Sequence, residues 1–221
     1  AAHSRQRSPP ATRTPRRTQN LLAGCIFDSS AVKSAFALLL TRVTEPRTGK
    51  FMRLEVYIMQ RTISAMVGKG SVNHNSRKFK AENVDGERSH LNIDYCNEPI
   101  KKIYHELFDD ALKRYNEKQT RADRRIENYY EKIRNPKQEK PFHELILQIG
   151  DKENMSAESE NGQLSRQILD EYYRGFQERN PNLKVFSAHL HMDEATPHLH
   201  IDFVPFTTGS KRGLDTRVSL K

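Results

Sequence analysis

The stretch that decides the fold, Val185–Phe206, reads VFSAHLHMDEATPHLHIDFVPF. Apolar and polar residues alternate on both sides of Met192–Pro197, which predicts two strands, Val185–His191 and His198–Phe206. The short separation favours an antiparallel pair. Because side chains alternate between the two faces of a strand, the histidines share one face and the leucines the other.

Similar patterns upstream of this hairpin extend the prediction. Further strands are expected at Arg61–Val67, Ser89–Cys96 and Phe142–Ile149. Helices are expected from a Ser71 cap to about Lys80, from Pro99 to about Arg134, and at Gln163–Arg179. The whole set predicts an α+β fold with about five antiparallel strands, with helices packed on one face of the sheet and the histidines on the other.

The charge of the chain is unevenly distributed. The 221 residues carry a net charge of +9, and residues 1–50 hold nine Lys or Arg against two acidic residues, a net of +7. The first 20 residues are rich in Arg, Ser, Thr and Pro and show no periodicity. We therefore expect residues 1–58 to be a disordered basic extension and residues 59–221 to be one domain. Whether the extension is native, and whether the natural chain continues past Lys221, stay open.

Composition excludes several classes of protein. No run of 18 uncharged apolar residues occurs, which excludes a transmembrane helix. The two cysteines, Cys25 and Cys96, exclude a disulfide framework and a Cys-based zinc site, and they fit a reducing, cytoplasmic compartment. No Walker-type glycine loop is present. The excess of Lys and Arg over Asp and Glu favours nucleic acid as a partner.

The hairpin predicts a metal site. If its strands pair, His191 lies beside His198, about 5 Å away at the β-carbons, and His200 shares the face of His198. Three converging imidazoles are the ligand set of an open catalytic metal site. His189 lies on the same face, so either His189 or His191 could be the third ligand. The alternatives are a solvated polar face and a structural zinc site.

The turn of the hairpin adds two carboxylates. Asp193 and Glu194 either keep the turn soluble, or supply a residue that supports the ligands and a general base, a role that favours Glu194. An all-imidazole ligand set favours Mn²⁺ or another transition ion, with Mg²⁺ as the alternative.

Two separate motifs carry a family resemblance. HMDEATPHLH (191–200) is similar to the metal motif of Mob/Pre (MobV-type) plasmid mobilisation relaxases, which belong to the His-hydrophobic-His endonuclease superfamily. NHNSR (73–77), followed by RSHLN (88–92), resembles the first motif of the same family. The resemblance spans roughly residues 59–206.

The resemblance implies an enzyme of plasmid mobilisation, recombination and conjugation. Such an enzyme nicks single-stranded DNA at a transfer origin, stays covalently joined to the 5′ end, and later rejoins the strand. By motif match, His74 is the nucleophile, Arg77 holds the phosphate, and His191, His198 and His200 hold the metal. Glu194 accepts a proton or orients His74.

The resemblance also implies a DNA surface and further partners. DNA contacts are expected at Arg77, Lys78, Lys80 and Arg88. From their positions, Asp193 and His189 are expected to support the site. The same is expected of His90 and Asn92, which alternation places on one face of the predicted strand Ser89–Cys96. Other mobilisation proteins are expected to bind a C-terminal region that this sequence does not include. No residue of the segment 113–140 is matched.

Two rival functions stay open at this point. A rolling-circle replication initiator or a transposase would use the same metal chemistry with a tyrosine nucleophile, for which Tyr95 and Tyr104 are the candidates. A non-catalytic DNA-binding protein would use the histidines to hold a structural metal.

Overall fold

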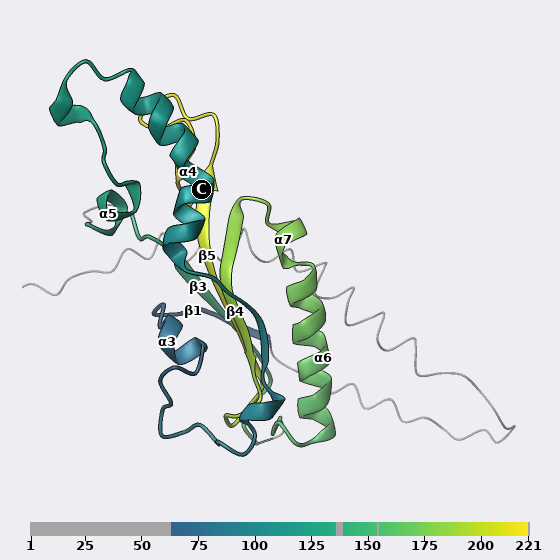
Figure 1. The fold of residues 1–221 in the computed structure, drawn as a ribbon. Coiled ribbons are helices and arrows are strands. Elements are labelled where there is room, and N and C mark those ends of the chain that lie inside the picture. The colour runs from purple at the N-terminus through teal and green to yellow at the C-terminus, as the bar shows by residue number, and fades with distance from the viewer. Residues whose placement is uncertain (1–62, 136–138, 154, 221) are drawn as a thin grey trace, which may run out of the picture.

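The computed structural model describes residues 63–135, 139–153 and 155–220, and within them six strands form one antiparallel arrangement (Figure 1). The path through the sheet is β1-β3-β5-β4-β2, and β6 pairs with β5. The strands are β1 (Ile63–Val67), β2 (Ile93–Asn97), β3 (His143–Ile149), β4 (Leu183–His191), β5 (His198–Thr207) and β6 (Arg217–Val218). The predicted α+β class and antiparallel sheet are confirmed. The predicted extension, residues 1–58, lies outside the described residues.

The hairpin β4–β5 forms the centre of the sheet, as predicted. Its register pairs His191 with His198 and His189 with His200. A β-bulge interrupts β4 between Val185 and Ser187. The extra residue in β4 lets Val185 pack on the leucine face, whereas Ser187 lies opposite Asp202 on the histidine face.

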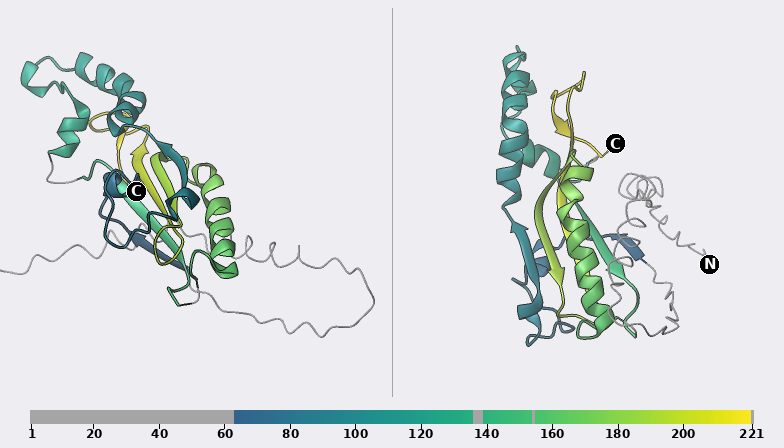
Figure 2. Two further views of the ribbon diagram at one scale, coloured as in Figure 1. Left: turned by 60° about the horizontal axis from the view of Figure 1, so that its bottom comes forward. Right: turned by 90° about the vertical axis from the view of Figure 1, so that its right-hand side faces the viewer.

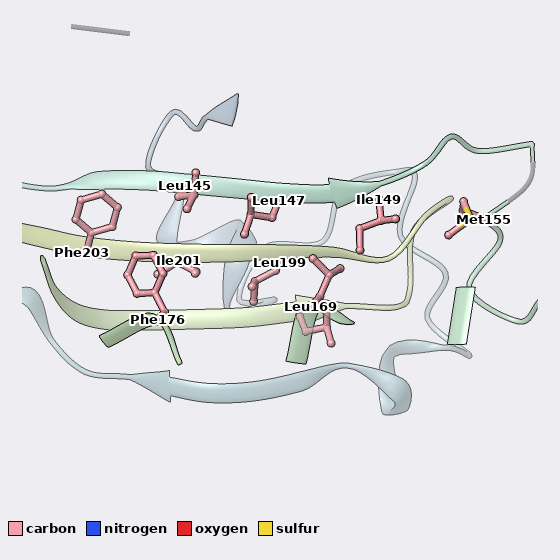
Figure 3. Close-up of a cluster of buried hydrophobic side chains, with 10 residues drawn as sticks. Leu145, Leu147, Ile149, Met155, Leu169, Phe176, Leu199, Ile201 and Phe203 are labelled. Carbon is pink, nitrogen blue, oxygen red and sulfur yellow. The ribbon is translucent and has the colours of Figure 1, made fainter. Parts of the chain in front are cut away.

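The helices pack on both faces of the sheet. They are α3 (Val72–Asn75), α4 (Ile100–Glu117), α5 (Tyr129–Arg134), α6 (Glu160–Arg174) and α7 (Phe176–Arg179), with 3₁₀ turns at Ser89–Leu91 and Ala122–Arg124. Leu169 of α6 and Phe176 of α7 join the leucine face of β3, β4 and β5 in one buried cluster (Figure 3).

The prediction that all helices cover one face is therefore corrected. A second buried cluster joins α4 and α5 to Phe186 of β4 and Val204 of β5, and Figure 2 shows α4 and α6 on opposite sides of the sheet. Val204 lies on the same face as the histidines of β5, because side chains alternate along the strand. The end of the histidine face that contains Val204 is apolar, so α4 and α5 shield it from water. The other end of the same face carries the polar site.

The long helix predicted from Pro99 to Arg134 is divided. The helix α4 ends at Glu117, because the Asn116 side chain turns back to the loop, accepting from the Ile126 N–H at 2.9 Å and donating to the Ile126 carbonyl at 2.8 Å. The helix α5 then begins anew after Asn128, whose side chain accepts from the Glu131 N–H and acts as an N-cap.

Three other predicted elements are shorter than expected. The helix α3 ends at Asn75 rather than near Lys80, and Arg77 adopts a left-handed φ of 55°. The predicted strand from Ser89 begins only at Ile93, after the 3₁₀ turn. The predicted helix Gln163–Arg179 is broken at Gly175, where an added Cβ would lie 2.2 Å from a guanidinium nitrogen of Arg179. In the part of the chain that the structure describes, no helix has the length and apolar character needed to cross a membrane.

Candidate metal centre and nucleophile

Three buried imidazoles meet at the end of the central hairpin. The ligand atoms of His191, His198 and His200 all lie within 4.8 Å of one another. The ring centroids are 4.8 to 5.2 Å apart. The antiparallel register creates this group, because it sets His191 directly opposite His198 and places His200 two residues further along the same face.

Hydrogen bonds fix which nitrogen of each ring is free. His191 Nε2 lies 2.8 Å from the Asn75 carbonyl oxygen, and His198 Nδ1 lies 2.9 Å from the Thr196 carbonyl oxygen. His200 Nδ1 lies 2.7 Å from Glu144 Oε1. Because these oxygens can only accept, the facing nitrogens carry the protons. The lone pairs of the neutral rings are therefore on His191 Nδ1, His198 Nε2 and His200 Nε2.

The free nitrogens suit a shared cation. His191 Nδ1 and His198 Nε2 are 3.3 Å apart. His200 Nε2 is buried, and no described residue forms a hydrogen bond with it. Two lone pairs at this separation repel each other, and a buried nitrogen without a partner costs free energy. A transition-metal ion bound by three imidazole nitrogens removes both penalties, and rings held by outer hydrogen bonds are typical of such sites.

The protonation state of the rings also suits metal binding. Burial, with a smaller effect from the neighbouring imidazoles, lowers the pKa of His191 to about 2. The same causes lower the pKa of His198. Both rings are therefore neutral at pH 7, which is the form that binds a metal.

His189 is occupied elsewhere. Its Nδ1 lies 2.6 Å from Asp94 Oδ1, and its Nε2 lies 3.1 Å from Ser187 Oγ. Both ring nitrogens are therefore engaged. His191 is the residue whose free nitrogen faces the rings of β5.

His74 lies against this group. Its ring centroid is 6.1 Å from that of His191 and 6.2 Å from that of His200. The side chain is 23% exposed, so a phosphate can reach it from solvent. Arg77 lies after the end of α3 and has a left-handed backbone conformation. Its side chain returns to the helix, where Nη1 comes within 3.4 Å of His74 Nε2.

Glu194 joins the nucleophile candidate to the metal centre. Its Oε1 lies 3.6 Å from His74 Nε2, 3.7 Å from His198 Nε2 and 2.9 Å from Arg77 Nη2. One carboxylate oxygen thus contacts the cation of Arg77 and lies near both imidazoles. Such a position suits a proton acceptor or a group that orients the His74 ring.

Asp193 is buried and holds Arg77 in place. Its carboxylate accepts hydrogen bonds from the guanidinium of Arg77, from Ser89 Oγ at 3.0 Å and from Asn92 Nδ2 at 2.7 Å. Burial alone would raise the pKa of this carboxyl. Its hydrogen bonds and the charge of Arg77 outweigh burial and lower the pKa to about 2. Asp193 is therefore ionised and supports Arg77, rather than keeping the turn soluble.

The residues expected to contact DNA fall into two groups. Lys78 and Lys80 are exposed. Arg88 instead braces the turn, because Nη1 donates to the carbonyl oxygens of Met192 and Glu194 at 3.2 Å each and Nε pairs with Asp85 at 2.8 Å. Arg88 therefore holds the turn that carries Glu194.

The expectations for Asn92 and His90 have opposite outcomes. Asn92 reaches the turn, donating to Asp193 and accepting from the Met192 N–H at 2.7 Å. His90 does not reach it: the 3₁₀ turn leaves its ring exposed, with Nδ1 2.6 Å from the Glu87 carbonyl oxygen. The alternation that placed both on one strand face does not apply before Ile93.

Sequence reasoning missed two residues that connect the site. Glu144 of β3 accepts from His200 and, at 2.7 Å, from the Gly70 N–H. Asn75 Nδ2 donates to Glu144 Oε1 at 2.8 Å and to Asp202 Oδ2 at 3.0 Å. The available signal was the one carboxylate in the strand FHELILQI.

The two candidate tyrosines lie elsewhere. The Tyr95 hydroxyl donates to Asp170 of α6 at 2.8 Å, and its ring stacks on Tyr173 at 4.0 Å, so it belongs to the leucine face. The Tyr104 hydroxyl donates to the Pro141 carbonyl at 2.7 Å from within the α4 cluster. Neither is part of the histidine group.

Comparison with known proteins gives one family and several relatives. The model of the Mob_Pre family, described as plasmid recombination enzyme, matches residues 69–219. A plasmid recombination enzyme from Bacillus sp. is 28% identical over 151 residues, covering 66% of this chain and 32% of that protein. A type 2 plasmid recombination enzyme from Staphylococcus aureus is 29% identical over 165 residues, covering 73% of this chain and 35% of that protein.

The chain thus spans about a third of the length of the curated relatives it matches. Among solved structures, it resembles a Mn-bound crystal structure of the MobM relaxase domain with plasmid pMV158 oriT DNA. The identity is 24%, the match covers 67% of this chain and 72% of that chain, and the TM-score is 0.42.

Proposed function

Because this chain belongs to the Mob_Pre family of plasmid recombination enzymes, we propose that it is a metal-dependent relaxase that nicks and rejoins one DNA strand at a plasmid or mobile-element transfer origin. The observation that carries the proposal is the contact of His74 with the three-histidine group, with Arg77 and Glu194 beside it. A nucleophile, a phosphate-binding cation and a carboxylate thus lie next to a site for a divalent ion. We place this activity in the bacterial cytoplasm.

The proposed step is a transesterification. A lone pair of the neutral His74 ring attacks the scissile phosphorus, a P–N bond forms, and the P–O3′ bond breaks. The ring loses its proton to Glu194, directly or through water, and the 3′ oxygen leaves with a proton from solvent. Rejoining is the reverse attack of the 3′ hydroxyl, so no nucleotide cofactor is needed. The planar guanidinium of Arg77 suits two phosphate oxygens and would hold the phosphate in line.

The proposed ligands of the metal are His191, His198 and His200. When bound, the ion would neutralise charge on the scissile phosphate as the bond to O3′ breaks. Imidazole nitrogens favour Mn²⁺ or a similar ion over Mg²⁺, which remains the alternative. The exposed Lys78 and Lys80 are proposed to attract the DNA backbone.

The test is a covalent adduct. The full chain is incubated with Mn²⁺ and a pool of single-stranded oligonucleotides, and the adduct is mapped by mass spectrometry. We expect His74→Ala to abolish the adduct while oligonucleotide binding is largely kept. The matched control is His105→Ala, which removes an exposed histidine of α4 and should leave the yield unchanged.

The acid stability of the adduct distinguishes a histidine nucleophile from a tyrosine nucleophile. A phosphohistidine bond is acid-labile, whereas a phosphotyrosine bond survives acid. An acid-stable adduct, or one of undiminished yield in His74→Ala, would transfer the nucleophile to a tyrosine. No adduct from any oligonucleotide in the pool would favour the non-catalytic alternative.

A further inference from the structure

A groove of about 780 Å³ opens next to the candidate nucleophile. Ser71, Val72 and Asn73, the residues immediately before His74, form one side of it. The other sides are formed by the junction between β2 and α4, by the helix α5, and by Lys78, Phe142 and Phe186. Figure 1 shows α3 and α5 on the same side of the sheet. The groove is thus continuous along the chain with the segment that carries His74.

Three aromatic side chains form part of the wall of the groove. Phe142 packs edge-on against Phe186 at 5.3 Å, and Tyr130 packs edge-on against Tyr104 at 5.0 Å. Phe142, Phe186 and Tyr130 all line the groove. Phe142 and Tyr130 are half-buried, so each keeps an open part of its ring on which a planar ligand can stack, whereas Phe186 is buried and supports Phe142.

The rim carries polar groups without protein partners. In the described part of the chain, the side chains of Asn73, Lys78 and Asn97 are exposed and make no hydrogen bond or ion pair with another residue. Arg134 forms only a long exposed pair with Glu131, at 3.6 Å. The acidic residue of the rim, Glu98, is already paired with Lys102. Two available cations and two available amides therefore surround an aromatic wall.

We propose that this groove binds the nucleotides of single-stranded DNA that adjoin the scissile phosphate. The inference rests on the proposed function, since it needs a DNA strand held at His74. Lys78 and Arg134 match backbone phosphates, Tyr130 and Phe142 match the faces of bases, and the amides of Asn73 and Asn97 match base edges. The volume lies within the range of about 300–1,000 Å³ of small-molecule sites, enough for one or two nucleotides.

Salt-dependent binding is the first test. The full chain is titrated with a fluorescent 12-residue oligothymidine at several salt concentrations. Arg134→Ala should weaken binding about fivefold to tenfold and reduce the slope of log K against log salt by about 0.7, the value for one lost contact to a single strand. Arg124→Ala removes a similarly exposed arginine from the turn before α5, outside the groove, and should change neither quantity.

Photocrosslinking is the second test. The same oligonucleotide carrying one 5-iodouracil is irradiated with the protein, and we expect adducts on peptides that contain Tyr130 or Phe142. Crosslinks confined to other segments, or equal binding by Arg134→Ala and Arg124→Ala, would overturn the groove proposal. Neither test needs catalysis. If the groove crosslinks to the oligonucleotide but the protein forms no His74 adduct, the relaxase activity is refuted and the groove proposal stands.

Discussion

Glu144 is the residue that connects the two halves of the candidate site. Its carboxylate accepts from the ring of His200 on β5, a proposed metal ligand. It also accepts from Gly70, shortly before α3, and from Asn75, the last residue of α3. It is 3% exposed, so these bonds form away from water. Burial would raise the pKa of this carboxyl, but its hydrogen bonds and His200 outweigh burial and lower it.

Two substitutions on different elements should therefore have the same effect. Glu144→Gln should weaken Mn²⁺ binding by about 10- to 100-fold, the usual effect of losing an outer partner of a metal-binding histidine. Gly68→Ala should act similarly, because its Cβ would lie 1.8 Å from Glu144 Oε2 and would displace the carboxylate. Isothermal titration with Mn²⁺ measures both.

Gly86→Ala is the matched control for the glycine. There the nearest atom to an added Cβ is the Lys80 ammonium nitrogen at 4.0 Å, so Mn²⁺ affinity should not change. Wild-type affinity in both Glu144→Gln and Gly68→Ala would show that Glu144 does not support the metal ligands.

The buried histidines predict a dependence of stability on pH. The pKa of His191 is about 2 in the folded state and about 6.5 when unfolded, so below pH 6.5 the unfolded chain binds a proton that the folded chain does not. Stability is thus lost as pH falls from about 6.5 towards 2, by about 1.4 kcal/mol per unit. Burial lowers the pKa of His143 to about 4, with the same sign. The pKa of Asp202, raised to about 6 by burial, offsets part of the loss.

Urea denaturation of the metal-free protein at pH 7 and pH 5 measures this loss. His191 alone accounts for about 2 kcal/mol over this interval. His191→Gln should flatten the pH dependence, whereas His105→Gln, on the exposed face of α4, should leave it as in the wild type. Equal unfolding free energies at the two pH values in the wild type would contradict the buried neutral state of His191.

At the scale of elements, the central hairpin was predictable and the helices were predictable only in part. Alternation over Val185–Phe206 is a local signal, and it gave both strands and their pairing. The end of α4 depends instead on Asn116, whose side chain satisfies the backbone of Ile126, ten residues away. A side-chain hydrogen bond of this kind does not change the spacing of apolar residues. The sequence pattern therefore predicted a helix that continues to Arg134.

Asn116 should therefore control the loop between α4 and α5. Asn116→Ala leaves the Ile126 N–H and carbonyl without these partners and should cost about 1–3 kcal/mol of unfolding free energy. Hydrogen exchange should increase at Ile126 and in α5. Lys113→Ala, an exposed change on the same helix, serves as the reference. Unchanged exchange at Ile126 would mean that the side chain does not fix the loop.

At the scale of the whole molecule, two buried clusters cover opposite faces of the sheet. Neither contains His191, His198 or His200. We therefore expect chelation to stop nicking while the fold is kept. The melting temperature should fall only as far as the lost free energy of metal binding accounts for. Circular dichroism and an adduct assay with and without chelator measure the two effects. Unfolding on chelation would instead indicate a structural metal.

The candidate site was predictable where its residues are neighbours in sequence. His191, His198, His200 and Glu194 lie within one hairpin, and His74 and Arg77 lie in one short motif. The contacts of Glu144 with Asn75 and His200 span 69 and 56 residues, and they exist only because β3 pairs with β5 and α3 packs nearby. No spacing in a single sequence marks such a contact.

The bulge in β4 lets one strand serve two different surroundings. The hairpin turn fixes the direction of His189 and His191, and the extra residue at Phe186 lets the preceding part of the strand follow its own alternation. Phe186 therefore joins the apolar cluster of α4 and α5, while His189 and His191 keep the face that they share with the histidines of β5. One extra residue thus lets the same face of the sheet be apolar at one end and polar at the other.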